Sequence, residues 1–522
     1  MATSLSILCR MKQKEIVMLT LCFLIGFALR FHTLDQKSLW VDEIHTLNDS
    51  RDGLNAQLKF YKENPTYLHP PLFFILTHLF YPFQHSERDL RIIPLIFGTL
   101  SIPMIYFLAR SFSPPSALPC AISLTFMTYH ISLSQDGRSY SLMMFLGMAA
   151  LYFFMEHLKT LRNRYLLGGG ISFAILFYTN YGSIPFIVLS QALWFYKARE
   201  DDEKPRLSSV LILNGLLLLL CSPWILLAFF HYKGQPLMDP FQQRVPIFLG
   251  GILYGVLHDW SPHLPLMLAS VTLLIIFPIF SKSKRNALLL LTVLFVPIGG
   301  IYLFCKSFNV GHFVTSRYFI NFLPLFFISI YLALNALEVR FEKWKSSIRL
   351  KVLFLILLIA SNLTILPLYY RSEKQDFRGL VTYLKGYLRE GDRIFVSAMD
   401  LMPGILYYFG TVPERRHYLI PYEKVSENEI VYAKPFVYQN KIFVLHNSRW
   451  CCEQYIADGN RLWVVAGKLF AAKLKQNSNY IPKGYFDGSF LNFDRFPADA
   501  SLYLFLLDPR SPNEEAIDMM IK

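Results

Sequence analysis

Charged residues are scarce in this chain, and their scarcity argues against an ordinary soluble protein. Asp, Glu, Lys and Arg together make up 17% of the 522 residues, while 53% of the residues are hydrophobic. Soluble globular proteins carry roughly 25% charged residues. With a mean hydropathy of +0.34, the composition indicates a polytopic membrane protein.

Cysteines, internal repeats and glycine-rich phosphate motifs are also few or absent. Five of the seven cysteines lie in or beside apolar runs, where cysteine behaves as a small hydrophobic residue. The adjacent pair Cys451-Cys452 has no second Cys or His pair at zinc-ligand spacing. No repeat of the kind found in many transporters is visible. No phosphate fingerprint accompanies the C-terminal strands, which argues against nucleotide chemistry there.

The positive charge of the chain is unevenly distributed. The formal net charge is +14, yet residues 371–522 contain 20 basic and 18 acidic residues and are nearly balanced. The excess therefore lies in the hydrophobic part, mostly in short connectors. This distribution carries topology information and does not resemble the basic patch of a nucleic-acid-binding protein.

Long hydrophobic runs divide the first 370 residues into eleven predicted membrane spans. A full crossing needs about 20 apolar residues, so the runs 165–179 and 183–196 are expected to be thin or broken helices joined at Asn180-Tyr181-Gly182. The first run follows a basic N-terminus without a small-residue cleavage site, which indicates a retained anchor. The predicted spans are 16–34, 91–110, 117–133, 140–158, 165–179, 183–196, 207–230, 263–280, 286–305, 319–337 and 351–370.

The basic connectors orient these spans. All of them fall on one side if the N-terminus is cytoplasmic, and eleven crossings then place the C-terminus outside. The apolar segment 72–83 is too short to span, and counting it would invert every later connector. We therefore expect interfacial helices within a first external loop, residues 35–90. The sequence predicts a multi-pass protein of the cell (inner or plasma) membrane. The connectors lie near residues 110, 159–164, 197–206, 282–285 and 340–351.

Residues 371–522 differ in character from the hydrophobic part. Their charge is mixed, and short buried strands alternate with amphipathic helices, which predicts a small soluble α/β domain outside the membrane. The predicted organisation is thus a transmembrane catalytic module over 1–370 followed by this domain. The expected helix covers 376–388, and the expected strands are 393–397, 442–445, 462–465 and 502–507.

Ten polar residues beside the predicted spans fall on the external side of this topology. Taken singly, each is typical of a helix cap, an interfacial tyrosine or an arginine that reaches toward lipid headgroups. Charged groups near lipid are costly and are retained where they pair or function. Their gathering on one face therefore predicts a site open to one aqueous compartment. They are Asp42, Glu43, His69, Arg91, Gln135, Asp136, Arg138, Tyr140, Arg317 and Tyr318.

An enzyme site on that face must receive its activated group from a lipid, because nucleotide-activated donors are not normally available there. A polyprenyl-phosphate sugar dissolves its chain in the bilayer and presents its head at the interface. Transfer requires a base for the acceptor hydroxyl and cations for the leaving phosphate. One carboxylate of the Asp42-Glu43 pair would be the base, with Asp42 favoured. The planar forks of Arg138 and Arg317 suit phosphate oxygens.

The other polar residues are candidates for binding the phosphate or the sugar. Asp136 can orient an arginine or hold a sugar hydroxyl, and His69 can hydrogen-bond to either group while Pro70-Pro71 fixes the loop. Tyr140 and Tyr318 can hydrogen-bond to the phosphate, although tyrosines at a membrane interface look the same. Arg91 and Gln135 complete the predicted binding set.

The order of these motifs resembles the GT-C superfamily of polyprenyl-phosphate-sugar-dependent glycosyltransferases. The resemblance is strongest to the bacterial branch near the protein O-mannosyltransferases, glycosyltransferase family 39, and covers roughly residues 15–400. The segments that carry it are Leu39-Trp40-Val41-Asp42-Glu43, His69-Pro70-Pro71-Leu72-Phe73-Phe74, Arg91-Ile92-Ile93-Pro94 with Gly98, Ser134-Gln135-Asp136-Gly137-Arg138-Ser139-Tyr140-Ser141-Leu142, Ser316-Arg317-Tyr318 with Leu323-Pro324, Gln375-Asp376-Phe377-Arg378-Gly379, and Gly391-Asp392.

The resemblance implies a GT-C helical module in which Asp42 acts as or orients the base, with inversion at the anomeric carbon. A relative that transfers aminoarabinose to lipid A has Lys where this chain has His69, which argues against an aminoarabinose donor. Some relatives hold a divalent metal with separated acidic residues, and Asp42 with Asp136 could mimic such a pair. Members with monophosphate donors generally resemble a metal-free design, so we expect no obligatory metal and no other cofactor.

Two other classes of function compete with sugar transfer. One is a transporter or flippase of lipid-linked sugars, which would place its charges near the bilayer midplane. The other is a polysaccharide ligase or polymerase with a diphosphate donor. The favoured interpretation is transfer of a sugar, mannose-like above others, to a protein, lipid or glycan acceptor outside the cytoplasm.

Overall fold

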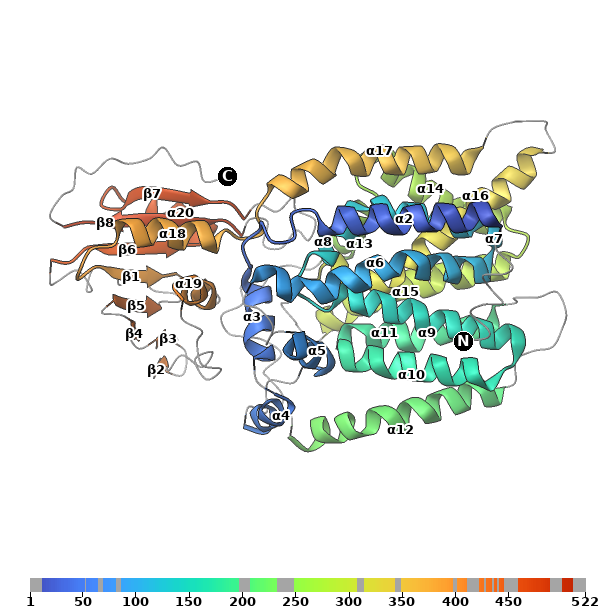
Figure 1. Cartoon of the computed structure of the whole chain (residues 1–522), viewed down its shortest axis with the longest axis horizontal. Helices are drawn as coiled ribbons and strands as arrows, with labels where there is room; N and C mark the ends of the chain where they lie inside the picture. Colours follow the sequence, from blue (N-terminus) through green and yellow to red (C-terminus); the bar gives the residue numbers. More distant parts are fainter. Residues whose placement is uncertain are drawn as a thin grey trace. The chain divides into compact units, whose positions relative to one another are not determined.

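The computed structural model of the chain is shown in Figure 1. The sequence predictions for Cys9 and for the Cys451-Cys452 pair fall outside the residues it describes. It describes residues 12–51, 53–63, 69–80, 86–196, 207–231, 248–307, 314–342, 349–397, 401–410, 422–426, 429–433, 436–438, 441–445, 459–488 and 500–509.

The chain divides into two compact units. The first, called here the helical unit, comprises Met1–Leu34, Asp52–Pro82 and Arg91–Pro367. The second, the composite unit, combines Leu368–Lys522 with two pieces of the predicted first external loop, Asp35–Arg51 and Phe83–Leu90. The sequence placed that loop with the transmembrane module, whereas the contacts group these two pieces with the C-terminal residues.

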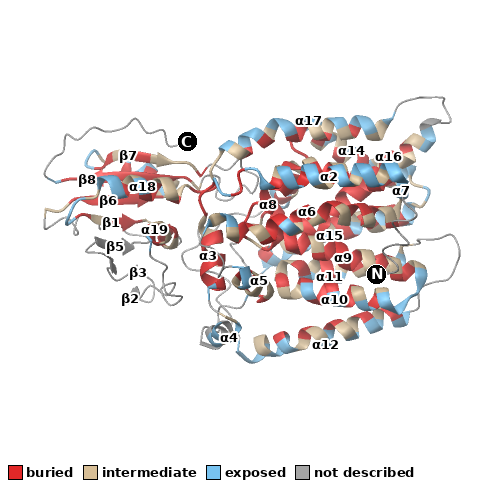
Figure 2. Ribbon diagram, in the orientation of Figure 1, coloured by how far each residue is buried: buried red, intermediate tan, exposed pale blue. Residues whose placement is uncertain are grey.

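The helical unit is built from long helices that run alongside one another (Figure 1). Most residues of α9 and α16 are buried, whereas most of α12 is exposed and apolar, as expected for a surface that faces lipid (Figure 2). The helices, of which α6 and α17 also contribute residues to the composite unit, are α2 (Gln13–Phe31), α4 (Leu54–Glu63), α5 (Leu72–Phe80), α6 (Glu87–Phe112), α7 (Pro114–Phe126), α8 (Thr128–Ser134), α9 (Tyr140–Thr160), α10 (Asn163–Thr179), η2 (Tyr181–Ser183), α11 (Ile184–Ser190), η3 (Gln191–Phe195), α12 (Leu207–His231), α13 (Leu249–Trp260), α14 (Leu264–Phe280), α15 (Lys284–Ser307), η4 (Ser316–Phe322), α16 (Leu323–Glu342) and α17 (Leu350–Arg371).

Several helices of the described chain are long and apolar enough to cross a membrane. Six pass this test by length and composition, and the bent pair α13–α14 brings the number to seven. The chain is therefore a polytopic helical membrane protein. Eleven crossings stay a prediction, because the other predicted spans form shorter helices or, in α2, a helix with three charged residues. The six are α6, α9, α12, α15, Ser316–Arg340 and α17.

The helices are interrupted at two places, one between two predicted spans and one within a predicted span. Asn180 ends α10 and accepts the Gly182 N–H through its side chain at 2.7 Å, so the expected break at this tripeptide is confirmed. The break between α7 and α8 was not predicted. There Met127 is extended, and Asn362 of α17 supplies the hydrogen bond that the helix loses: its Oδ1 accepts the Thr128 N–H at 2.8 Å.

The bent pair α13–α14 contains a helix that the sequence did not predict. The two helices meet at an angle of 108°. Only the second was expected, as the span 263–280. The first is 12 residues long and includes three glycines, His258 and Asp259, so its sequence lacks the continuous apolar run that marks a full span.

A close approach between α6 and α8 requires glycine at position 98. A Cβ atom at Gly98 would lie 2.1 Å from Ser134 Oγ, closer than side-chain atoms can pack. Ser134 ends α8 and directly precedes the predicted motif that begins at Gln135. The glycine therefore fixes where that motif leaves the helix.

The composite unit contains a mixed β-sheet, with both parallel and antiparallel strand pairs, together with α-helices. This confirms the α/β architecture expected for the C-terminal residues. The six-stranded sheet has the order β4-β5-β1-β6-β8-β7, with β1 parallel to β5 and β6 and the other pairs antiparallel. The four predicted strands and the predicted helix are all present. The elements are α3 (Val41–Ser50), α18 (Phe377–Tyr387), β1 (Arg393–Val396), α19 (Met402–Tyr408), β2 (Tyr422–Ser426), β3 (Glu429–Ala433), β4 (Phe436–Tyr438), β5 (Lys441–Leu445), β6 (Leu462–Ala466), α20 (Lys468–Leu474), β7 (Ile481–Phe486) and β8 (Leu502–Leu507).

Strands β6 and β8 form the buried centre of this sheet (Figure 2). A buried ion pair lies at the start of β6. Arg461 Nη2 lies 2.7 Å from Asp392 Oδ2, and Trp463 Nε1 donates to the same carboxylate at 2.9 Å. The arginine also donates to the Tyr387 carbonyl at the end of α18. Asp392 belongs to the segment Gly391-Asp392, one of those that carry the family resemblance. In the structure, its ion pair with Arg461 helps to join α18 to the sheet.

Candidate functional site

The predicted site residues of the helical unit lie at one end of its helices. One direct contact among them joins Arg317 to Tyr140, and Gln135 bonds to the chain at the end of α2. The basic connectors that the structure describes lie at the other end, where Arg110 at the end of α6 pairs with Glu15 at the start of α2 at 3.3 Å. The predicted connector 197–206 falls outside the described residues. The helical unit therefore has a basic end and a separate polar end that carries the candidate site.

Arg317 is held between two tyrosine rings. Its guanidinium carbon lies 5.6 Å from the centroid of the Tyr140 ring and 5.8 Å from that of Tyr318. Both distances are in the range of cation–π contacts, and the side chain is buried. The N–H edges of a guanidinium are the part that binds phosphate oxygens. The structure thus brings together three of the predicted residues.

A buried acid that the sequence analysis missed supports this arginine. Asp259, at the end of α13, is 2% exposed, and its Oδ2 accepts a hydrogen bond from Ser316 Oγ at 2.5 Å. Ser316 Oγ also lies 2.8 Å from the Tyr129 hydroxyl. Because Ser316 directly precedes Arg317, this cluster fixes the start of η4. An isolated acid just before the span 263–280 was the signal that could have revealed it.

The Asp259 cluster yields a prediction for donor binding. We expect Asp259→Ala to raise the KM for a polyprenyl-phosphate sugar about tenfold, because a buried hydrogen bond to a charged group contributes roughly 1.5–3 kcal/mol. Asp259→Asn keeps an acceptor oxygen and should stay near wild type. Ser270→Ala, which breaks the buried Ser261–Ser270 bond of 2.9 Å, is the matched control. An unchanged KM in Asp259→Ala would show that the cluster does not serve Arg317.

Arg91 and Gln135 make structural bonds to the end of the first helix. Arg91 Nη1 donates to the Leu34 carbonyl at 2.9 Å, and Gln135 Nε2 donates to the Arg30 carbonyl at 2.8 Å and to the His32 carbonyl. Both side chains are buried. They therefore hold the stretch that leads from α2 into residue 35, and their predicted contacts with the donor stay a prediction.

The remaining predicted residues of the helical unit differ in exposure. Asp136 is buried, and its carbonyl accepts the Arg138 N–H at 2.6 Å in the tight turn before α9. Arg138 is half-buried. His69 is exposed, and its ring meets the Phe74 ring edge-on with centroids 6.4 Å apart. Their binding roles also stay predictions.

Arg30 is a second buried charge that the sequence analysis missed. It is fully buried in α2 and donates to the Leu124 and Thr125 carbonyls at 2.9 and 3.3 Å, while its Nη2 lies 2.8 Å from His130 Nδ1. These carbonyls lie just before the break between α7 and α8, where helical partners are missing. A lone arginine inside the predicted span 16–34 was the available signal.

The carboxylates Asp42 and Glu43 lie in the first turn of α3, in the composite unit. Asp42 is half-buried. Glu43 is fully buried, and its Oε2 accepts the Trp40 N–H at 3.4 Å, so this carboxylate caps its own helix. The two carboxylates therefore differ in environment, and the role of Asp42 as the base stays a prediction.

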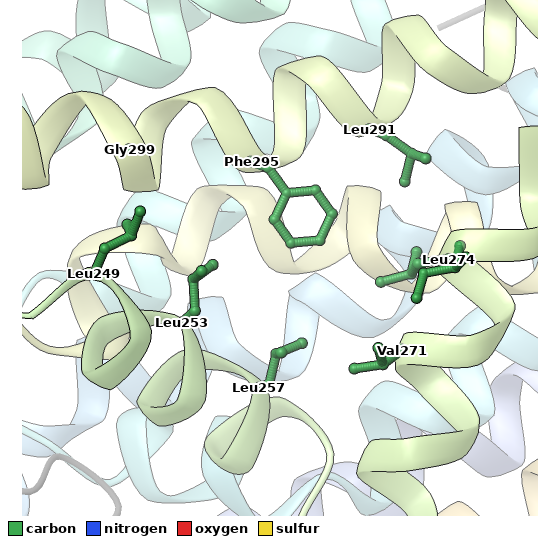
Figure 3. Close-up of a pocket in the computed structure, with 9 residues that line it drawn as sticks. Leu249, Leu253, Leu257, Val271, Leu274, Leu291, Phe295 and Gly299 are labelled. Atoms are coloured by element: carbon green, nitrogen blue, oxygen red, sulfur yellow. The ribbon is translucent and has the colours of Figure 1, made fainter.

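An apolar pocket lies between α13, α14 and α15 in the helical unit (Figure 3). Its volume is about 510 Å³. It extends from buried Leu274 to Ile275, which is 65% exposed, and thus reaches the apolar outer surface. Its first helix, α13, ends at Asp259. The lining residues are Leu249, Leu253, Leu257, Val271, Leu274, Ile275, Leu291, Phe295 and Gly299.

Metal-ligand clusters were sought among the described residues. In that part of the chain, no group of three or more His, Cys, Asp or Glu side chains could hold a metal ion. The expectation that no obligatory metal is needed stays a prediction.

Comparisons with known proteins were made for both sequence and structure. Residues 68–226 match the family described as dolichyl-phosphate-mannose-protein mannosyltransferase. No curated protein sequence matches the chain. The fold is similar to that of ArnT from Cupriavidus metallidurans in the apo state, with a TM-score of 0.54 and 12% identity over 94% of this chain and 97% of that one. The same protein bound to undecaprenyl phosphate gives a TM-score of 0.51 and 11% identity, with coverage of 96% and 99%.

Proposed function

We propose that this chain is a membrane glycosyltransferase of the GT-C type that transfers one sugar from polyprenyl phosphate to an acceptor outside the cytoplasm. The sugar is mannose-like, the anomeric carbon is inverted, and Asp42 is the base. The acceptor is a protein, lipid or glycan. The catalytic module lies within residues 1–370, and residues 371–522 form an α/β domain on the same external side.

The observation that carries the proposal is a buried Arg317 in contact with two tyrosine rings, together with an apolar pocket in the same unit. A polyprenyl phosphate has a strongly charged head and a long apolar chain, so its site needs a cation near an apolar surface. Arg317 supplies the cation. The pocket of about 510 Å³ between α13 and α15 suits part of an isoprenoid chain, and α13 joins the two through the Asp259–Ser316 bond.

The proposed reaction is a single displacement. Asp42 takes the proton of the acceptor hydroxyl as the acceptor oxygen bonds to the anomeric carbon. The bond from that carbon to the phosphate oxygen breaks, and its electron pair leaves with polyprenyl phosphate. Arg317 and Arg138 stabilise the charge on the leaving phosphate. The other proposed donor ligands are His69, Arg91, Gln135, Asp136, Tyr140 and Tyr318.

The choice of a mannose-like sugar and a monophosphate carrier has two supports. The family that matches residues 68–226 is described as dolichyl-phosphate-mannose-protein mannosyltransferase. One solved structure with this fold is bound to undecaprenyl phosphate. We propose that no metal takes part. The external orientation is supported by the described basic connectors, among them Arg110, at the end of the helical unit opposite to Arg317, because basic connectors face the cytoplasm.

A donor panel tests the proposal. The purified protein in lipid nanodiscs is given polyprenyl-phosphate mannose, galactose or arabinose, and in parallel a polyprenyl-diphosphate sugar, with envelope extract as the source of acceptor. We expect release of polyprenyl monophosphate from the mannose donor and full activity in EDTA. Turnover of the diphosphate donor alone would instead favour the ligase alternative, and loss of activity in EDTA that Mn²⁺ or Mg²⁺ restores would overturn metal independence.

A further inference from the structure

The segment that leads into α3 is bound by side chains of the composite unit. It comprises residues 35–41 and immediately precedes Asp42. Four side chains far away in sequence bind it directly, and a fifth, Glu87, binds two of these four. We call this group the loop clamp: Glu87, Glu373, Gln375, Arg378 and Tyr408.

The clamp satisfies backbone N–H groups of the segment that leads into α3 and the N–H of Val41, the first residue of the helix. The first N–H groups of any helix lack partners within the helix. Glu373 Oε2 accepts the Ser38 N–H at 3.0 Å, and the Tyr408 hydroxyl accepts the Leu39 N–H at 2.7 Å. Gln375 Oε1 accepts the Val41 N–H at 3.2 Å. Together with the bond from Trp40 to Glu43, every N–H from residue 38 to 41 has a side-chain acceptor.

Arg378 is the centre of the clamp. Its guanidinium donates to the Gln36 carbonyl at 3.1 Å and to the Lys37 carbonyl at 3.3 Å, and its backbone N–H donates to Ser38 Oγ at 3.2 Å. The same guanidinium forms an ion pair with Glu87 at 2.8 Å. The planar guanidinium of Arg378 therefore binds both the loop carbonyls and the Glu87 carboxylate.

Tyr408 closes the network from the other side. Its hydroxyl donates to Glu87 Oε1 at 3.0 Å while it accepts the Leu39 N–H. Burial, followed by the Glu87 carboxylate, raises the pKa of this phenol well above its usual range, so the hydroxyl keeps the proton that it donates. Burial also raises the pKa of the Glu373 carboxyl, against a lowering by the Ser38 N–H and Lys37.

The clamp accounts for the segment Gln375-Asp376-Phe377-Arg378-Gly379, for which the sequence analysis suggested no function. Gln375 and Arg378 bind the loop. The Asp376 carboxylate caps α18 by accepting the Gly379 N–H at 2.7 Å, and it would lie 2.2 Å from a Cβ at that position, so a larger residue there would displace the cap. Phe377 packs against Gly404 of α19, the helix that presents Tyr408.

We propose that Arg378 and Tyr408 are positioning residues for the transfer reaction: by fixing residues 35–41 they set the orientation of α3 and of its carboxylate Asp42. The proposal rests on the proposed function, because it takes Asp42 as the base. The C-terminal domain then has a part in catalysis through the loop that it holds. A displacement of a reacting group by about 1 Å can cost roughly 10²-fold in rate.

The test measures loop protection and catalysis separately in the full-length protein in nanodiscs. Arg378→Gln and Tyr408→Phe are compared with wild type by amide hydrogen exchange at residues 38–41 and by kcat and KM for polyprenyl-phosphate mannose. We expect exchange to rise about tenfold and kcat to fall about 10- to 100-fold, with donor KM within about twofold. Arg378→Lys should recover part of kcat.

Arg461→Gln is the matched control for a loss of domain stability. Arg461 lies in the same unit and also binds a carboxylate and a backbone carbonyl, but its bonds go to Asp392 and Tyr387. We expect it to leave loop exchange and kcat near wild type in the folded protein. An equal loss of kcat in Arg461→Gln would mean that domain stability explains the effect, and the proposal would fall.

The two measurements separate this proposal from the proposed function. Unchanged exchange at residues 38–41 in Arg378→Gln would overturn the clamp even in an active enzyme. If wild type transfers no sugar from any donor while exchange still depends on Arg378, the proposed function fails. The conclusion that the loop clamp orients α3 then remains valid.

Discussion

Asp42→Asn is expected to lower sugar transfer about 10²- to 10⁴-fold, the usual contribution of a positioned general base. Asparagine keeps the size of the side chain but cannot take the proton of the acceptor hydroxyl. Binding of the donor should change little, because the phosphate is assigned to arginines elsewhere. The measurement is kcat for polyprenyl-phosphate mannose together with donor affinity in the same nanodisc preparation.

Two matched variants make the Asp42 result specific. Asp35→Asn removes an exposed carboxylate of the same segment and should transfer sugar normally. Glu43→Gln keeps an oxygen to accept the Trp40 N–H, and transfer should stay within a few-fold of wild type. A large loss in Glu43→Gln with an active Asp42→Asn would exchange the roles of the two carboxylates. Normal transfer in both variants would remove the pair from the mechanism.

Arg317→Ala is expected to weaken donor binding about 100-fold. The variant loses a charge-assisted contact with phosphate, worth roughly 1.5–3 kcal/mol, and it also loses the stacking on Tyr140 and Tyr318. Arg317→Lys should fall between Ala and wild type, because lysine keeps the charge without the planar fork. Direct titration with polyprenyl phosphate, which carries no sugar, isolates this effect from catalysis.

The control for Arg317 is an arginine at the basic end of the helical unit. Arg164 is exposed, and its guanidinium packs on the ring of Tyr165. Arg164→Ala therefore removes a charge and a cation–π contact of the same type without touching the polar end. If both variants bind polyprenyl phosphate as wild type does, the lipid head does not lie at Arg317.

The sequence predicted those features that depend on local pattern. Hydrophobic length located the helices from α9 to α17 except α13, and the Asn180-Tyr181-Gly182 break followed from two runs that were each too short. Strands β1, β6 and β8 were found because each is a short, mainly apolar run between polar turns. The grouping of Tyr140, Arg317 and Tyr318 followed from topology, since the ends of antiparallel helices meet at one face.

The features that were missed depend on partners far away in the chain. The break at Met127 is stabilised by Asn362, and nothing near residue 127 shows that an amide will be supplied from α17. Asp259 lies in a helix too short and too polar to be read as a span. The bonds between Arg378 and residues 36–38 join segments more than 300 positions apart. Sequence pattern marked the segment around Arg378 but could not reveal what it binds.

One measurement tests most directly whether this protein makes a bond or moves a lipid. Proteoliposomes with polyprenyl-phosphate [¹⁴C]mannose and an acceptor extract are assayed for labelled product and for donor that has crossed the bilayer. The account predicts labelled acceptor and stoichiometric polyprenyl phosphate, both lost in Asp42→Asn and Arg317→Ala. Donor that crosses the bilayer intact, with no labelled acceptor in wild type, would contradict it and identify a flippase.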